Sequence, residues 1–310
     1  MTVLVYGNLS SEQKEILEQK NDAELQFIFF SELTESEQLE KFAKCEILIG
    51  NPPAALFENP HPQLKFWQLD SAGFNQYQNL QLNIPVANMG SFFADRCAET
   101  IVIGALAFYR GIHQVVRLQQ EKLWKGNAIR KTIQGISSKN VLILGAGAIG
   151  LACRRMLTGF GCKITLAARK NPVAQIHDHD DVLKILPTID LVINTLPGTA
   201  VNYVSSEFIH LMKEGAVYAN VGRGNTTDED ALIEALECGK LAGAVLDVTA
   251  IEPLPTDSKL WDMEQVILTQ HSGGGDVHEA TGKMNQILAN VKRFINNEDL
   301  QNLVDVNSGY

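Results

Sequence analysis

NVLILGAGAIG, residues 140–150, joins an apolar run to a glycine-rich turn, and this short segment indicates the fold class. Gly145, Gly147 and Gly150 follow the G-x-G-x-x-G pattern. The first glycine makes the tight turn, the second lets the backbone approach a pyrophosphate, and the third permits close packing of helix on strand. Exposed amides and the helix dipole then favour an anion. Because the pattern follows an expected strand and opens an expected helix, it predicts a dinucleotide site rather than a packing turn alone. The expected cofactor-binding residues in this turn are Gly145, Gly147, Ala148, Ile149 and Gly150.

Strand-like and helix-like runs alternate on both sides of this turn, as in parallel sheets with crossover helices. The strands expected before the turn are 2–6, 26–30, 45–50, 65–70 and 84–88, with helices at 10–20 and 34–44. The strands expected from the turn onward are 140–145, 163–168, 190–195, 216–221, 242–247 and 265–269, with helices such as 207–214 and 228–240. A helical stretch at 92–124, expected to break near Gly111, connects the two series, and a final helix at 277–298 precedes a short polar tail.

The two series predict an α/β protein with two domains. One is a Rossmann domain with a doubly wound parallel sheet, and the other is a smaller, flavodoxin-like substrate (catalytic) domain. We expect residues 1–91 and 283–310 to form the substrate-binding domain and residues 92–282 the dinucleotide-binding domain. A chain of 310 residues is long enough for two sizeable cores.

The composition is that of a soluble globular protein, with 45% hydrophobic and 20% charged residues. A net charge of -10 argues against a general nucleic-acid or anionic-membrane surface. The N-terminal MTVLVYGNLSSEQ does not resemble a signal peptide, and the apolar segment 100–108 is expected to be a buried helix rather than a membrane span. The five cysteines lack C-x-x-C spacing, which indicates small buried thiols in a cytoplasmic protein.

The end of the second strand of the later series indicates which dinucleotide is bound. An NAD-preferring site has an acidic residue there, which binds the ribose 2′-hydroxyl. Here the position falls near Ala168, and Arg169 and Lys170 follow it. Two cations can bind a 2′-phosphate, and no carboxylate repels it. We therefore predict NADP(H) as the preferred cofactor, with NAD(H) possible. The alternative is that both cations are solvated charges at a strand end.

Three later strands deliver a cation, a carboxylate and an imidazole to the edge of the sheet where ligands bind. The strand at 216–221 ends before Arg223, the strand at 242–247 precedes Glu252, and the strand at 265–269 ends before His271. Reduction of a ketone by hydride leaves an alkoxide that needs a proton, which histidine can supply. A carboxylate beside it favours the imidazolium, and an arginine binds a carboxylate and polarises a carbonyl. Singly, each residue has an ordinary structural explanation.

The later series resembles the cofactor domain of the D-isomer-specific 2-hydroxyacid dehydrogenase family. VGRGNTTDEDAL (221–232), LAGAVLDVTAIEPLP (241–255) and LWDMEQVILTQHSGG (260–274) are similar to its arginine, glutamate and histidine motifs. The family commonly has proline before the histidine, whereas this chain has Gln270. The resemblance implies that the catalytic residues are Arg223, Glu252 and His271. It also places Val221 and Asp247 at the cofactor site, Asp247 as a supporting carboxylate.

The resemblance extends over most of the chain. LKFWQLDSAGFNQY (64–77) is similar to the family's substrate loop, whose backbone amides hold the substrate carboxylate. NTLPGT (194–199) is similar to a loop on the cofactor side. LAARK resembles the NADP-using glyoxylate/hydroxypyruvate reductases of the family, and a homodimer is the family's usual assembly. The implied substrate-binding residues are Ser71, Ala72, Gly73 and Arg223, and the further cofactor residues are Leu196, Pro197 and Thr199.

These observations predict an NADP(H)-dependent enzyme acting on CH–OH donors, which interconverts a small 2-oxoacid and its D-2-hydroxyacid. Glyoxylate and hydroxypyruvate are the first candidates, and larger 2-oxoacids stay open. The alternatives are a non-catalytic dinucleotide-sensing module and an interaction protein that retains the fold. HDHDD (177–181) could suggest a metal site, but acidic residues in the first turn of a helix explain it better, so we expect no metal.

Overall fold

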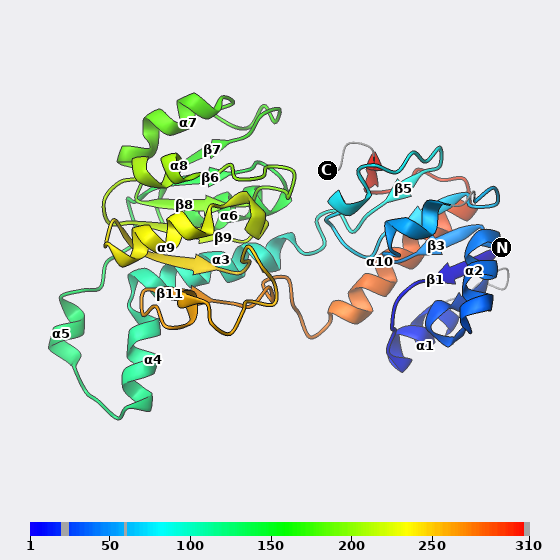
Figure 1. Ribbon diagram of the computed structural model, residues 1–310, viewed down its shortest axis with the longest axis horizontal. Coiled ribbons are helices and arrows are strands. Elements are labelled where there is room, and N and C mark those ends of the chain that lie inside the picture. The colour runs from blue at the N-terminus through cyan, green and yellow to red at the C-terminus, as the bar shows by residue number, and fades with distance from the viewer. Residues whose placement is uncertain (20–24, 59–60, 307–310) are drawn as a thin grey trace. The chain divides into compact units, whose positions relative to one another are not determined.

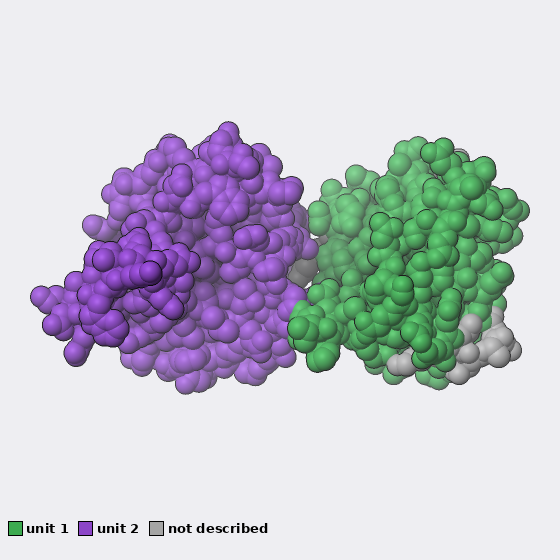
Figure 2. Space-filling view, turned by 90° about the horizontal axis from the view of Figure 1, so that it is seen from below, with its two compact units in different colours: residues 1–92, 276–310 green, residues 93–275 purple. Residues whose placement is uncertain are grey.

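The computed structural model describes residues 1–19, 25–58 and 61–306. The chain divides into two compact units, one of residues 1–92 with 276–310 and one of residues 93–275 (Figure 2). The expected division after residues 91 and 282 differs from these units by one residue and by seven residues. The second boundary lies earlier because the whole helix α10 (Glu279–Ile295) packs on α1 (Ser11–Gln19) and on the sheet of the first unit.

The first unit, unit 1, contains a six-stranded sheet in the order β12-β5-β4-β3-β1-β2. Three of these strands, β1, β3 and β5, are labelled in Figure 1. Its strands are β1 (Thr2–Val5), β2 (Gln26–Phe29), β3 (Ile47–Ile49), β4 (Phe66–Gln68), β5 (Val86–Ala87) and β12 (Leu303–Val304). The first five are parallel in the order 2-1-3-4-5, which is that of flavodoxin-like sheets. The expected polar tail is wrong in one respect, because β12 within it pairs antiparallel with β5.

The sequence at both ends of helix α2 (Glu35–Lys44) in unit 1 stabilises the helix. Thr34 and Glu37 form a capping box, which satisfies two backbone N–H groups at the start of the helix. Glutamates in the first turn and lysines in the last turn complement the helix dipole. Three short 3-10 helices complete the unit: η1 (Phe30–Glu32), η2 (Ala54–Glu58) and η3 (Asn75–Tyr77).

Unit 2 contains a parallel sheet in the order β11-β10-β9-β8-β6-β7. Its strands are β6 (Asn140–Leu144), β7 (Lys163–Ala167), β8 (Leu191–Asn194), β9 (Ala216–Asn220), β10 (Leu241–Leu246) and β11 (Val266–Leu268). Beyond β7, an isolated parallel bridge pairs Ala167 with Ile176. If this bridge is counted as the third strand, the order becomes 3-2-1-4-5-6 with one further strand. That is the doubly wound Rossmann order.

The helices of unit 2 include the expected connector, which breaks at Gly111. There the backbone turns left-handed (φ 65°), and the two helices on either side meet at a bend of 72°. Among the described helices no single one is long and apolar enough to cross a membrane, and only this bent pair meets that test jointly. The helices are α3 (Ala94–Tyr109), α4 (Ile112–Gln120), α5 (Gly126–Arg130), α6 (Ala148–Gly159), α7 (His179–Ile185), α8 (Ser206–Leu211), α9 (Glu229–Glu237) and the 3-10 helices η4 (Leu186–Thr188), η5 (Gly224–Thr226) and η6 (Lys259–Trp261).

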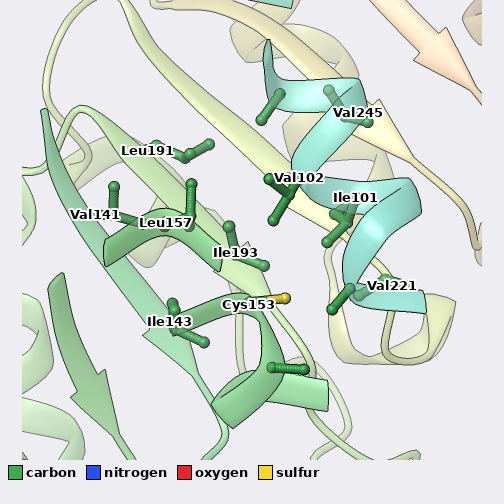
Figure 3. Close-up of a cluster of buried hydrophobic side chains, with 14 of the residues drawn as sticks. Ile101, Val102, Val141, Ile143, Cys153, Leu157, Leu191, Ile193, Val221 and Val245 are labelled. Atoms are coloured by element: carbon green, nitrogen blue, oxygen red, sulfur yellow. The ribbon is translucent and has the colours of Figure 1, made fainter. Parts of the chain in front are cut away.

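The core of unit 2 covers both faces of its sheet, as an all-parallel sheet requires. Val141 and Ile143 of β6 point to one face, where α3 and α6 pack on them (Figure 3). Leu142 and Leu144 point to the other face, toward side chains of α8 and α9. The sequence of β6 is therefore a continuous apolar run, without the alternation of apolar and polar residues that a strand with one solvent-exposed face shows.

The cysteines follow the expectation of small buried residues only in part. Cys45 and Cys153 are buried, and burial raises the pKa of each thiol to about 12, so both stay protonated. Cys97 and Cys162 are half-buried. The expectation is wrong for Cys238, which is exposed because it lies at the C-terminal end of α9.

Candidate active site

The glycine turn between β6 and α6 is closed to side chains at its two ends. A Cβ on Gly145 would lie 2.5 Å from Oγ1 of Thr195, and one on Gly150 would lie 2.1 Å from the carbonyl oxygen of Gly145. Gly147 is the N-cap of α6 and offers no side chain to cap it. The first amides of α6 have no acceptor within the helix, so the turn can hold an anion such as a pyrophosphate.

The loop after β7 is tied to this turn by a residue that sequence reasoning missed. Asn171 donates from Nδ2 to the carbonyl oxygen of Ala146 (2.7 Å). Arg169 and Lys170, just before it, are exposed, and neither belongs to an ion pair within the described part of the chain. In the sequence, the pair Asn171-Pro172 is typical of a turn, and this was the signal that could have identified Asn171.

The segment HDHDD starts helix α7, as expected. Asp178 is the N-cap and accepts a hydrogen bond from the backbone N–H of Asp180 (2.9 Å), and Asp180 and Asp181 lie in the first turn. Asp181 also pairs with Lys184 (2.6 Å). In residues 1–19, 25–58 and 61–306, no three His, Cys, Asp or Glu side chains are grouped so that they could hold a metal ion.

A buried polar network shapes the loop that carries Arg223. The side chain of Asn220 accepts from the backbone N–H of Gly222 (2.9 Å), and Oγ1 of Thr226 donates to the carbonyl oxygen of Arg223 (2.6 Å). Asn194 in turn donates to Oγ1 of Thr226 (2.8 Å). Asn194, Asn220 and Thr226 are all buried, and satisfied buried networks are rigid. Both β8 and β9 end in an asparagine after an apolar run, and this repeated pattern was the signal that sequence reasoning overlooked.

The guanidinium of Arg223 faces no carboxylate among the described residues. It donates from Nη1 to the carbonyl oxygen of Gly222 (2.8 Å) and is half-buried. Its planar donors therefore stay available for an anion or a carbonyl oxygen.

Glu252 and His271 form a direct pair. Nδ1 of His271 lies 2.6 Å from Oε2 of Glu252, while Oε1 of Glu252 accepts the backbone N–H of Thr249 (3.0 Å). The carboxylate is thus fixed from the backbone side and orients the imidazole, leaving Nε2 to act on a ligand.

The Arg223 loop packs directly on the Glu252 loop. A Cβ on Gly224 would lie 1.8 Å from the carbonyl oxygen of Thr249, the residue whose N–H holds Glu252. Ala250 is held from the other side, because its N–H donates to Oε2 of Glu229 (2.8 Å). The chain therefore places the two loops against each other although the candidates are 29 positions apart in sequence, at 223 and 252.

Asp247 shapes the histidine loop. It is 4% exposed, and its Oδ1 accepts from Oγ1 of Thr269 (2.6 Å) and from the backbone N–H groups of Ser272 (3.1 Å) and Gly273 (3.0 Å). The N–H of His271 donates to the carbonyl oxygen of Asp247 (2.6 Å). These bonds act on the imidazole loop, and the expected part of Asp247 in cofactor binding stays a prediction.

The histidine loop has a left-handed backbone at two successive residues, Gln270 (φ 55°) and His271 (φ 53°). Such a backbone costs about 1–2 kcal/mol per non-glycine residue, which the hydrogen bonds to Asp247 help to offset. A proline could not take this conformation, because its ring holds φ near −65°. The departure at Gln270 from the family's usual proline thus matches the geometry of the loop.

A cavity of about 420 Å³ lies against the Glu252–His271 pair within unit 2. Arg223 does not line it. Much of its wall is apolar, which is typical of small-molecule sites. The lining residues are Leu246, Asp247, Thr249, Glu252, Pro253, Leu254, Trp261, Leu268, Gln270 and His271.

The remaining cofactor candidates of unit 2 lie at the ends of β8 and β9. Leu196 donates its N–H to Oδ1 of Asn194 (2.9 Å), Pro197 is half-buried, and Thr199 is exposed. Val221 is buried in the core, with its N–H bonded to the carbonyl oxygen of Asn194 (3.0 Å). Their contacts with a cofactor stay predictions.

The candidate substrate loop, Ser71 to Gly73, belongs to unit 1. Its carbonyl groups are bound within the unit: that of Ser71 by the N–H of Met89 (3.0 Å), that of Ala72 by Nδ2 of Asn88 (2.6 Å), and that of Gly73 by Oγ of Ser71 (2.6 Å). The backbone N–H groups of Ser71, Ala72 and Gly73 donate to no acceptor within the described residues. Successive amides of this kind form a cradle for an anion.

Comparisons with known proteins agree on one family. A model of the NAD-binding domain of D-isomer specific 2-hydroxyacid dehydrogenases matches residues 102–273. The chain is 32% identical to glyoxylate/hydroxypyruvate reductase B of Pectobacterium atrosepticum, over 70% of this chain and 71% of that one. It is 30% identical to a probable 2-ketogluconate reductase of Dictyostelium discoideum, over 87% and 85%. A solved probable 2-hydroxyacid dehydrogenase from Rhizobium etli, in complex with NADP, HEPES and L(+)-tartaric acid, has the same fold, with a TM-score of 0.83, 24% identity and coverage of 100% and 99%.

Proposed function

Because this chain belongs to the D-isomer-specific 2-hydroxyacid dehydrogenase family, and is therefore an oxidoreductase acting on CH–OH donors, we propose that it reduces a small 2-oxoacid to the D-2-hydroxyacid with NADPH. The observation that carries this proposal is the pair of His271 and Glu252, with 2.6 Å between Nδ1 and Oε2. An imidazole held by a carboxylate at a strand end is the acid–base group that carbonyl reduction needs.

His271 supplies the proton in this proposal. NADPH, when bound, supplies the hydride that reaches the carbonyl carbon of the 2-oxoacid. His271 then donates the proton on Nε2 to the carbonyl oxygen, and Glu252 stabilises the imidazolium from Nδ1. In the reverse direction, the neutral imidazole accepts the hydroxyl proton at Nε2.

The substrate carboxylate is held by backbone amides and by Arg223. The N–H groups of Ser71, Ala72 and Gly73, which have no acceptor among the described residues, support carboxylate binding by unit 1. The guanidinium of Arg223, which faces no described carboxylate, supports binding and polarisation of the carbonyl by unit 2.

NADP(H) is the preferred cofactor in this proposal. The residues present fit a dinucleotide, because the turn at Gly145 and Gly150 has no room for side chains and the first amides of α6 have no acceptor within the helix. Arg169 and Lys170 follow β7, where a 2′-phosphate would add two negative charges. NAD(H) binds more weakly, since it gives these cations nothing to pair with.

The proposed assembly is a homodimer built on the connector of unit 2. Ile112 and Val116 of α4 and Leu123 beyond it are exposed, and Trp124 is 97% exposed. An apolar surface of this kind favours association, and a two-fold dimer would bury it on both copies. Light scattering on the purified protein tests this. We expect a dimer, and Trp124→Ser should weaken it, whereas a monomeric parent at micromolar concentration would contradict the assembly.

Oxidation of NADPH, followed by its absorbance with a panel of 2-oxoacids, tests the function. Glyoxylate and hydroxypyruvate come first, followed by pyruvate and by phenylpyruvate, whose ring tests whether the cavity of about 420 Å³ beside His271 admits a large side chain. A rise in the melting temperature with NADP⁺ would show cofactor binding independently of turnover. Binding without turnover on any 2-oxoacid would instead support a dinucleotide-sensing module.

A further inference from the structure

Helix α10 presents three polar side chains to the last residue of β4 and to the loops that follow β4 and β5. Gln286 donates to the carbonyl oxygen of Met89 (3.0 Å), and Asn290 donates to Oε1 of Gln68 (2.7 Å). One helical turn before Gln286, Nζ of Lys283 lies 3.6 Å from Oδ2 of Asp70. Positions 283, 286 and 290 share one face of a helix. This face therefore holds the segment that leads into the substrate loop.

Asp70 places a negative charge directly before an anion cradle. The next three residues turn their carbonyl groups to partners inside unit 1, and their N–H groups donate to no described acceptor. A carboxylate bound by these N–H groups would be repelled by an uncompensated Asp70. The loop therefore needs a cation close to Asp70.

Lys283 supplies that cation in a sheltered position. Its side chain is 17% exposed and that of Asp70 is 34% exposed, whereas Lys14, which pairs with Glu32 in the same unit, is 25% exposed. Solvent and salt screen such a pair less than an exposed one. The charge of Lys283 therefore acts on the loop more strongly than a surface lysine would.

We propose that Lys283 is a positioning residue for the substrate carboxylate. By pairing with Asp70 it neutralises the negative charge beside the cradle, so that the N–H groups of Ser71, Ala72 and Gly73 can bind an anion. The identity of that anion as a 2-oxoacid rests on the proposed function. The direction of the charge effect, in which Lys283 favours anion binding and unpaired Asp70 opposes it, does not depend on the proposed function.

Steady-state kinetics on the intact protein, with glyoxylate and NADPH, test whether Lys283 acts by neutralising the charge of Asp70. Lys283→Met should raise the KM for the 2-oxoacid about tenfold, because it leaves Asp70 unpaired beside the cradle, while kcat changes less than about twofold. Asp70→Asn should leave this KM unchanged or lower it. In the double variant the KM should return to within about threefold of the parent value. Lys283→Arg should behave like the parent.

If the ion pair only held the loop in place, the KM would follow a different pattern. Both single variants would then have a raised KM, and the KM of the double variant would be no lower. Lys65→Met is the matched control, since Lys65 pairs with Glu46 elsewhere in unit 1. Thermal unfolding of each variant shows whether it folds. If Lys283→Met does not fold, the Asp70→Asn result still decides, because a raised KM in that variant overturns the proposal.

Calorimetric titration of oxalate, an analogue of the 2-oxoacid carboxylate, separates this inference from the proposed function. We expect Lys283→Met to weaken oxalate binding about tenfold and Asp70→Asn not to weaken it. If no 2-oxoacid is turned over but oxalate follows this pattern, the proposed function fails and the inference stands. If the parent binds no oxalate, or Lys283→Met binds it as the parent does, the inference fails.

Discussion

Replacing Glu252 by glutamine tests the acid–base pair with little change in shape. Oε1 of Glu252 already accepts the N–H of Thr249 (3.0 Å), so the new amide must direct its NH₂ group at Nδ1 of His271. Nδ1 then becomes an acceptor, and the hydrogen of the neutral ring is fixed on Nε2. The imidazolium loses its charged partner, and the neutral ring loses its free lone pair at Nε2.

The structure gives the size of the effect in each direction. A hydrogen bond to a charged group is worth about 1.5–3 kcal/mol. The side chains of His271 and Glu252 are 51% and 34% exposed, so solvent reduces the value toward about 1.5 kcal/mol. Reduction of the 2-oxoacid should therefore slow about tenfold. Oxidation of the hydroxyacid should slow about 100-fold, because it also needs a base at Nε2.

Stopped-time or continuous assays in both directions, at saturating cofactor, measure these losses. Glu229→Gln is the matched control, since Glu229 binds the N–H of Ala250 in the same loop without touching His271. We expect the control to keep its rates and both variants to bind NADP⁺ as the parent does. Equal and near-parent rates for Glu252→Gln in both directions would refute the proposed role of the pair.

Four further outcomes follow from the structure. His271→Ala should lose at least about 100-fold in kcat while its NADP⁺ affinity, measured by protein fluorescence, stays unchanged. Arg169→Ser combined with Lys170→Ser should raise the KM for NADPH about 10- to 100-fold and leave the KM for NADH unchanged, and an unchanged NADPH value would contradict the 2′-phosphate site. Gly150→Ala should abolish NADP⁺ binding or prevent folding, because the added Cβ would lie 2.1 Å from a backbone oxygen of the turn. Leu157→Ala, in the fully buried core between α6 and the sheet, should lower the free energy of unfolding by about 2–5 kcal/mol in urea titrations.

Local patterns were sufficient for most elements of the fold. Every strand of the two expected series is present, because each is a short apolar run bounded by turn residues. The break of the connector was predictable at Gly111, since glycine adopts a left-handed backbone without strain. The edge strand β12 was missed, because two residues that pair at the edge of a sheet carry no periodic signal.

The candidate site divides in the same way. Gly145, Arg223 and His271 could be selected from the sequence, because motifs place them next to strand ends, where ligands of α/β sheets bind. The residues that hold the loops were not selected. Asn171 and Asn194 look like ordinary polar residues in the sequence, and their hydrogen bonds to Ala146 and Thr226 exist only once β6, β7, β8 and β9 are assembled.

The sequence by itself determined the two parallel sheets, the dinucleotide turn and the types of group that meet at the strand ends, because periodicity and turn chemistry are local properties of the chain. Only the tertiary structure decided how these groups are held. The 2.6 Å pair of Glu252 with His271, and the placement of Asp247 beneath the histidine loop, depend on the register of β10 against β11. The bond from Asn290 to Gln68 spans 222 positions of sequence, and such contacts are set by packing rather than by any neighbouring residue.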